Sequence, residues 1–324
     1  MRIVLTLFFC LFYNFIFAQK TIEKFYDSNW KPSNLSNASF YSNIRETDSG
    51  WYRIDVYLFT KKIQMVGLFE DSACTIKNGT FCYYYANGTP SSYGRYEHNI
   101  RQGIFASYYS NGIKKGYAEY DNGYLQGSSL SWNMNGSLAD SIFKDENNVY
   151  IKKSWFDNGN ISSIGILLNG EMQGTWKFFD INGKLTSIEE YDTGHVISRQ
   201  YFDESGKALA DTTNTDAEVK FENGKKGLQR FIDKYLEWPD YYHISQSDHA
   251  TLVIKMLINE KGEVKYVEVV CPIHPAFDSL ALKAFRKISN FNPAREHNRS
   301  VPSWMRVAII YNQDSPYLMY SPNN

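Results

Sequence analysis

The chain divides into two regions that differ in the spacing of their hydrophobic residues. Between residues 50 and 224, short runs of aromatic and β-branched residues alternate with turn signals such as Asn-Gly. Such runs are typical of β-strands, and Asn-Gly favours the type I′ turn of a β-hairpin. After residue 224, amphipathic helix patterns alternate with strand patterns. The sequence therefore predicts a mostly β chain with an α+β C-terminal domain.

The first region is a repeat with a period of 23 or 24 residues. Each unit has a turn glycine and, a few positions earlier, an aromatic residue. The turn glycines are Gly88, Gly112, Gly136, Gly159, Gly183 and Gly206, and the aromatic residues are Tyr84, Tyr108, Trp132, Trp155, Phe179 and Phe202. A second turn signal follows eleven residues after each of the first five glycines. Because two turns imply two strands, we predict an antiparallel meander of hairpins, with neighbouring strands about 4.8 Å apart.

The repeated aromatic residues allow two interpretations. They can pack each hairpin against the next, or they can form a surface that binds carbohydrate. The packing interpretation is favoured, because rings at a fixed period are what a stack of similar units needs to hold together.

Five elements are predicted between residues 225 and 313. Apolar residues at helical spacing predict a helix over residues 228–236. Alternating residues predict strands over 251–258 and 263–271, joined by a turn at residues 259–262. Pro275 opens a second helix, whose apolar side extends to Ile288. Residues 303–312 then form the last strand, which gives a small three-stranded sheet with two helices.

Composition and charge exclude several classes of protein. Aromatic residues make up 16% of the chain and charged residues only 21%, which argues against intrinsic disorder. The net charge of -1 and the absence of a basic run argue against a nucleic-acid partner. No Gly-rich phosphate-binding motif occurs, and the histidines and cysteines lack zinc spacing, so neither cofactor nor metal is expected.

Residues 1–18 are predicted to be a secretory signal peptide that is cleaved after Ala18. Arg2 precedes an apolar stretch from Ile3 to Phe17, which is shorter than the roughly 20 residues of a membrane-spanning helix. The expected location is the periplasm or the periplasmic face of the outer membrane, and an uncleaved inner-membrane anchor is the alternative.

Two further sets of residues could carry chemistry. Cys74 and Cys82 flank a turn and are the only pair that could form an internal disulfide; the alternative is that Cys74, Cys82 and Cys271 are three small buried residues. His243, Asp248 and His249 form the only cluster of histidine and acid along the sequence, but no nucleophile motif accompanies them. The protein is therefore expected not to be an enzyme.

Both regions resemble known families. The pattern G-x-W/F-x-x-Y-Y-x-N-G in residues 50–224 resembles MORN-type repeats, particularly the bacterial antitoxin-like variety. Residues 227–313, with INEKGEVKYVEVV, HPAFDSLALKAF and MRVAIIYN, resemble the C-terminal domain of TonB energy transducers. Phe291 stands where that family has Trp, and Arg299 stands near its turn glycine. The expected division is a signal peptide (1–18), a lead-in (19–49), repeats (50–224), the TonB-like domain (225–313) and a tail (314–324).

The TonB resemblance implies a binding site on the last strand. In that family the strand lies at the sheet edge, where receptors add an extended segment by β-augmentation. The residues carried over are Trp304, Met305, Arg306, Val307, Ala308, Ile309, Ile310 and Tyr311. The alternative is that the tail, with Pro316 and Pro322, protects this edge.

The implied function is that of an exported, non-enzymatic adaptor. Its partner would be an envelope protein, such as a TonB-dependent outer-membrane receptor or another transport-related assembly. In the competing interpretation the repeats bind the partner, and the C-terminal domain is a structural module that caps them or forms a homodimer. A third interpretation, an immunity or antitoxin-like protein, follows from the repeat resemblance alone.

Overall fold

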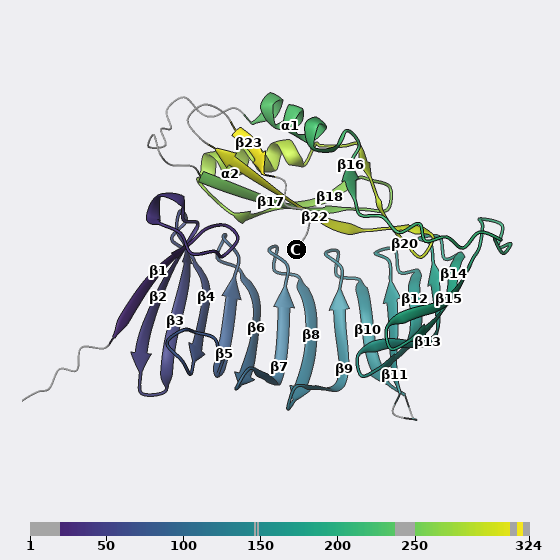
Figure 1. The fold of residues 1–324 in the computed structure, drawn as a ribbon, viewed down its shortest axis with the longest axis horizontal. Coiled ribbons are helices and arrows are strands. Elements are labelled where there is room, and N and C mark those ends of the chain that lie inside the picture. The colour runs from purple at the N-terminus through teal and green to yellow at the C-terminus, as the bar shows by residue number, and fades with distance from the viewer. Residues whose placement is uncertain (1–19, 146, 148, 237–249, 312–315, 320–324) are drawn as a thin grey trace, which may run out of the picture.

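The computed structural model describes residues 20–145, 147, 149–236, 250–311 and 316–319. These residues form a long antiparallel sheet of fifteen strands and a C-terminal domain that lies along one end of the strands (Figure 1). The prediction of a mostly β chain with an α+β C-terminal domain is confirmed.

The fifteen strands pair strictly in chain order, so the long sheet is a meander. Its strands are β1 (Thr21–Tyr26), β2 (Phe40–Thr47), β3 (Gly50–Tyr57), β4 (Ile63–Phe69), β5 (Gly79–Tyr84), β6 (Pro90–Glu97), β7 (Ile100–Tyr108), β8 (Lys114–Asp121), β9 (Tyr124–Trp132), β10 (Leu138–Lys144), β11 (Tyr150–Trp155), β12 (Ile161–Leu168), β13 (Glu171–Phe179), β14 (Leu185–Asp192) and β15 (His195–Tyr201). The first two strands lie in the expected lead-in, and the single turn of 3-10 helix η1 (Leu35–Asn37) lies between them.

The repeated turns explain why the hairpins keep one geometry. At the turn between β7 and β8, Gly112 has a φ of 84° and its N–H donates to the carbonyl of Tyr109 at 2.9 Å. The Tyr109 hydroxyl donates to the carbonyl of Trp132 in the next unit at 2.8 Å, and Tyr85 makes the same bond to Tyr108. At these two turns a tyrosine thereby ties the turn to the following repeat.

Aromatic rings pack across the strands of the meander. The rings of Phe81, Tyr96, Phe105 and Tyr120 form a series of edge-to-face contacts with centroids 5.2 to 5.5 Å apart. Such contacts are favourable beyond the area that they bury.

The C-terminal domain has the predicted order of helix, strand, strand, helix and strand. The elements are α1 (Gly224–Tyr235), β17 (Ala250–Ile258), β18 (Val264–Cys271), α2 (Pro275–Phe285) and β22 (Ser303–Tyr311). The tail adds β23 (Pro316–Met319), so the sheet has four strands in the order β18-β17-β22-β23. Two short antiparallel strand pairs complete the domain: β16 (Lys220–Phe221) with β19 (Phe291–Asn292), which are distant in the chain, and the hairpin of β20 (Ala294–Glu296) with β21 (Arg299–Val301). Ile288 lies beyond the end of α2 but is still buried in the core.

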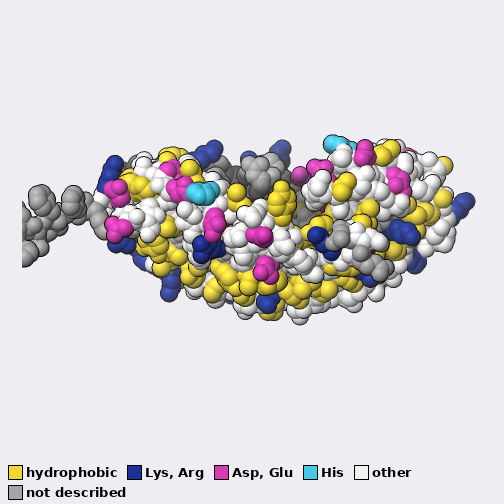
Figure 2. Space-filling model, turned by 90° about the horizontal axis from the view of Figure 1, so that it is seen from below, with side chains coloured by type: hydrophobic (Ala, Val, Ile, Leu, Met, Phe, Trp, Pro, Cys, Tyr) yellow, Lys and Arg dark blue, Asp and Glu magenta, His cyan; other side chains and the backbone are white. Residues whose placement is uncertain are grey.

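Both faces of the small sheet are covered. One face packs on the helices, through a core that includes Leu228, Ile232, Phe277 and Phe285. The other face lies on the ends of the meander strands, where Val253 and Cys271 pack against Phe40 and Tyr57 in a separate hydrophobic cluster (Figure 1). The far ends of the strands, seen in Figure 2, carry many hydrophobic side chains among scattered charges.

The described residues contain no helix that is long and apolar enough to cross a membrane. Cys74, Cys82 and Cys271 are free thiols, so of the two alternatives the bridge between Cys74 and Cys82 is not formed.

Candidate functional site

The outer edge of β22 is only partly covered. Along its whole length β22 pairs with β17 on one side, from Ser303 opposite Ile258 to Tyr311 opposite Ala250. On the other side β23 pairs with residues 308–311 alone. Within the described part of the chain, no strand pairs with the outer edge of residues 303–307. The structure therefore contains both expected features, an open edge at the start of the strand and a tail strand over its end.

The side chains of β22 are engaged on both faces. Met305 and Val307 belong to the core beneath the helices. On the opposite face, the Trp304 ring makes an edge contact with Tyr266 at 6.1 Å and lies 4.4 Å from the Lys255 ammonium. Arg306 donates from Nη2 to the carbonyl of Ser28 at 3.1 Å. A partner that approached this strand would therefore meet mainly backbone N–H and C=O groups.

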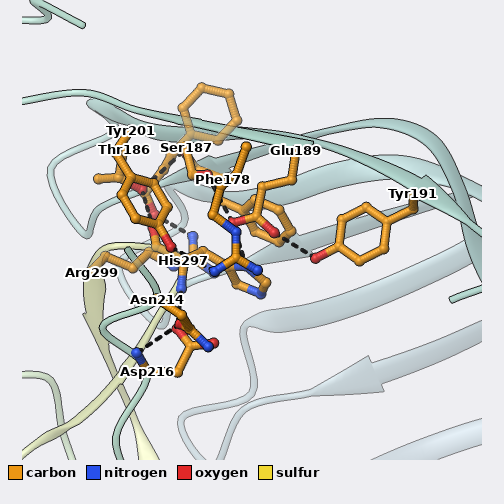
Figure 3. Close-up of polar contacts among 12 residues, drawn as sticks. Phe178, Thr186, Ser187, Glu189, Tyr191, Tyr201, Asn214, Asp216, His297 and Arg299 are labelled. Carbon is orange, nitrogen blue, oxygen red and sulfur yellow. Dashed lines mark hydrogen bonds and ion pairs between the residues drawn. The ribbon is translucent and has the colours of Figure 1, made fainter. Parts of the chain in front are cut away.

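The histidine and acid cluster expected at His243, Asp248 and His249 lies outside the described residues. A different pair, which is far apart in the sequence, comes together where the C-terminal domain meets the meander (Figure 3). Nδ1 of His297 lies 3.1 Å from Oε1 of Glu189 on β14. The described residues hold no group of three or more side chains that could bind a metal ion.

Glu189 is buried, with 1% of its surface exposed, and its carboxylate is fully surrounded by donors. The Tyr191 hydroxyl donates to Oε2 at 2.7 Å, and the Ser187 hydroxyl donates to Oε1 at 2.9 Å. Burial alone would raise the pKa of Glu189, but the hydrogen bonds from His297, Tyr191 and Ser187 outweigh it and hold the pKa at about 2. The carboxylate therefore stays ionised at neutral pH.

His297 occupies the tip of the hairpin formed by β20 and β21. Its φ of 54° and that of Asn298, 59°, give the tight turn that carries this tip. The His297 N–H donates to Asp216 at 3.0 Å, and its ring stacks on Phe178 with centroids 3.6 Å apart. The contacts with Glu189 and Phe178 dock the tip on the meander, and the contact with Asp216 ties it to the segment between β15 and β16 (Figure 3). The arrangement joins the hairpin tip to the meander through a buried carboxylate, so it is suited to holding the two bodies together.

Arg299 is the first residue of β21 in this hairpin and is 7% exposed. Its Nη1 donates to the carbonyls of Ser162 and Phe179, and its guanidinium lies 5.4 Å from the centre of the Phe178 ring. Burial lowers the pKa of Arg299 to about 10. Among the described residues, none accepts a hydrogen bond from Nε and none forms an ion pair with this side chain.

Residues 243–313 match the family model described as Gram-negative bacterial TonB protein C-terminal. The match includes β17, β18, α2 and β22, and it confirms the expected resemblance over these residues. A comparison with curated proteins finds no match to the chain. The repeats agree with the meander that the structure shows, whereas their similarity to MORN-type or antitoxin-like proteins stays a prediction. We call residues 225–313 the TonB-like domain.

The TonB-like domain and the meander enclose a cavity of about 850 Å³. The meander contributes turns and strands from Tyr109 to Phe178, and the TonB-like domain contributes residues that include Tyr266, Arg299 and Trp304. Sequence reasoning missed this cavity, together with Glu189 and His297. The only signal was Arg299, an arginine at a position where the resembled family has a turn glycine.

Proposed function

We propose that this protein is an exported, non-enzymatic adaptor whose TonB-like domain binds an envelope partner by strand addition. The observation that carries the proposal is the outer edge of residues 303–307, which pairs with no strand among the described residues, within a segment that matches the TonB C-terminal model. Strand addition takes its affinity from main-chain hydrogen bonds, which is what this edge offers. The partner class that fits is an outer-membrane transporter or a related assembly.

In this proposal the meander serves as a platform. The TonB-like domain does not hang from the end of the repeats, since it contacts the meander from Ser28, before β2, to Glu189 on β14. At about 4.8 Å for each strand spacing, the intervening sheet spans roughly 60 Å. The domain is thus held at several points, which fixes the direction in which the β22 edge faces.

The experiment compares proline substitutions at adjacent positions of β22. Consecutive residues point their N–H groups to opposite edges of a strand, so one of Arg306→Pro and Val307→Pro removes an outward donor while the other removes a bond to β17. Arg306→Ala is the matched control, because it loses the contact to Ser28 but keeps the backbone N–H. Binding is measured on arrays of extended peptides from outer-membrane proteins and by co-purification with envelope fractions.

We expect the outward-facing proline variant to stay folded and lose peptide binding, while Arg306→Ala keeps it. Thermal melting of each variant separates loss of binding from loss of fold. If the folded proline variant keeps every partner of the natural protein, strand addition at β22 is wrong.

A further inference from the structure

The cavity between the TonB-like domain and the meander has the size of a ligand site. Its volume of about 850 Å³ lies within the range of roughly 300 to 1,000 Å³ that is usual for small-molecule pockets. On one side Ser110 hydrogen-bonds to Tyr266 of the TonB-like domain, and on the other the tip residue His297 is docked on the meander. The cavity is therefore held open by contacts on both sides.

On the meander side of the cavity, polar side chains lie in a row across three neighbouring strands. Asp140, Ser154 and Ser163 lie directly opposite one another on β10, β11 and β12. The Ser154 hydroxyl donates to Asp140 at 2.6 Å, and Asp140 also lies 3.9 Å from Lys152. These groups can exchange hydrogen bonds with several hydroxyls of one ligand, because each has acceptor capacity left.

Aromatic side chains border this polar line. Tyr109 and Trp155 come from the meander, and Tyr266 and Trp304 come from the TonB-like domain; all four are half-buried and line the cavity. Rings with one face or edge exposed offer large apolar contact area beside polar groups. A sugar ring needs this combination, since its C–H face packs on an aromatic ring while its hydroxyls form hydrogen bonds.

Arg299 adds a buried positive charge to the wall. Its Nη1 is used by two neutral carbonyls, its Nε has no acceptor among the described residues, and no described carboxylate pairs with it. The acids Asp157 and Glu296, which also line the cavity, are exposed to solvent, and Glu189 is already bonded to His297 and Tyr191. Burial lowers the pKa of Arg299, although the carboxylates of Glu296, Asp180 and Glu189 act in the opposite direction without forming an ion pair with it. An anionic group in direct contact with the guanidinium would therefore be stabilising.

We propose that this cavity binds a carboxylate-bearing saccharide, with its carboxylate at Arg299 and its rings against the aromatic border. An acidic peptide fits less well. On the meander side the wall is built from interior strands, β10 to β13, whose backbone groups pair with their neighbours on both sides, so a peptide main chain finds no strand edge on that side. Trp304 of β22 lines the cavity with its side chain, whereas strand addition uses the backbone groups of the β22 edge. Either proposal can therefore fail without the other.

The test titrates the full chain with short oligosaccharides of galacturonate, mannuronate and glucuronate by isothermal titration calorimetry. Each is compared with its methyl ester, which keeps the rings and removes the charge, and with tri-glutamate. We expect at least one uronate probe to bind, its ester to bind at least tenfold more weakly, and tri-glutamate to bind more weakly than that uronate.

Two variants locate the site. Arg299→Gln should lower the affinity for the uronate at least tenfold and abolish the difference in affinity between acid and ester. Since Arg299 also donates hydrogen bonds to two carbonyls, this variant can lose its fold. Trp155→Ala is therefore the second variant, and it should lower the affinity for both acid and ester. Trp132→Ala is the matched control, because Trp132 holds the equivalent position one repeat earlier but does not line the cavity.

The proposal is overturned if none of the three uronates binds, if acid and ester bind equally, or if tri-glutamate binds as tightly as the best uronate. It is equally overturned if Trp155→Ala and Trp132→Ala have the same effect on binding.

Discussion

His297 Nδ1 and Glu189 Oε1 are 3.1 Å apart although 108 residues separate them in the chain. The histidine lies on the tip of a hairpin of the TonB-like domain, and the glutamate lies on β14 of the meander. Their contact joins the last repeats to the domain that follows them, so the charge state of Glu189 affects how the two bodies hold together.

The stability of the protein should therefore fall in acid. Because the pKa of Glu189 is about 2 in the folded state, below its ordinary value of 4.5, the unfolded state binds this proton more readily. The stabilisation is fully present above about pH 5 and is lost as the pH falls from about 4.5 toward 2; it amounts to about 3 kcal/mol. Glu189→Gln should remove most of it at pH 7, as measured by urea unfolding.

The control for this variant is Glu190→Gln, on the opposite face of the same strand. Glu190 accepts a hydrogen bond from the exposed Thr175 hydroxyl, and its change should alter the free energy of unfolding by less than about 0.5 kcal/mol. The decisive quantity is the difference in the free energy of unfolding between the natural protein and Glu189→Gln, measured at pH 7 and at pH 3. A gap of the same size at both values would contradict the assigned role of the carboxylate.

Local sequence signals were enough to predict most of the fold. The turn glycines, such as Gly112, mark conformations that few other residues adopt, and the alternation from Leu252 to Ile258 marks a strand with one apolar face. The strand β23 was harder to predict, because the two prolines of the tail argue against a strand. Pro316 is tolerated there as the first residue of an edge strand.

The junction could not be predicted, because no local pattern encodes a contact between distant residues. Glu189 belongs to a strand whose sequence fits an exposed acid as well as a buried one. His297 belongs to no repeating pattern in the sequence. Its position on a turn follows from the hairpin of residues 294–301, which the sequence did not predict. Arg299 differs from the resembled family at its position, but the sequence did not show that its side chain is buried against the meander.

Two glycines should be costly to replace for different reasons. At Gly165 a Cβ would lie 2.2 Å from the ring of Trp176, which is 2% exposed and donates from Nε1 to the carbonyl of Ile166. Since the ring has no room to move, Gly165→Ala should destabilise the fold by about 1–3 kcal/mol.

At Gly112 a Cβ meets nothing within 4 Å, but the positive φ makes Gly112→Val costly, also by about 1–3 kcal/mol.

Gly112→Asn separates the two causes. Asparagine tolerates positive φ better than valine, so this variant should retain more stability than Gly112→Val in denaturant unfolding. Equal losses for Asn and Val would mean that backbone strain is not what requires glycine at this turn.

Export should leave a chain that begins at Gln19. The apolar stretch ends at Phe17 and Ala18 is the first small residue after it, which favours cleavage there. The first strand of the meander starts at Thr21, so cleavage at Ala18 leaves β1 complete. N-terminal sequencing of protein from its native envelope checks this, and a chain that still begins with Met1 would favour the anchored alternative.

Removal of the tail should expose the end of the β22 edge. Residues 308–311 of β22 pair with residues 316–319, whereas residues 303–307 have no described strand on that side. In a chain that ends at Gln313, the amides of residues 308–311 that point away from β17 lose their acceptors and should exchange with deuterium faster. The amides that point toward β17 keep their partners, so alternate residues should differ in exchange.

Leu318→Pro is the companion variant, because it keeps the length of the tail while disfavouring its pairing with Ile309. Both variants should show the same pattern of exchange, and both should bind a partner strand more tightly if the tail and the partner compete for one edge. Unchanged exchange at residues 308–311 in both would show that β23 does not protect the edge. Faster exchange without tighter binding would mean that the tail covers residues 308–311 but does not compete with a partner strand. Strand addition would then be confined to residues 303–307.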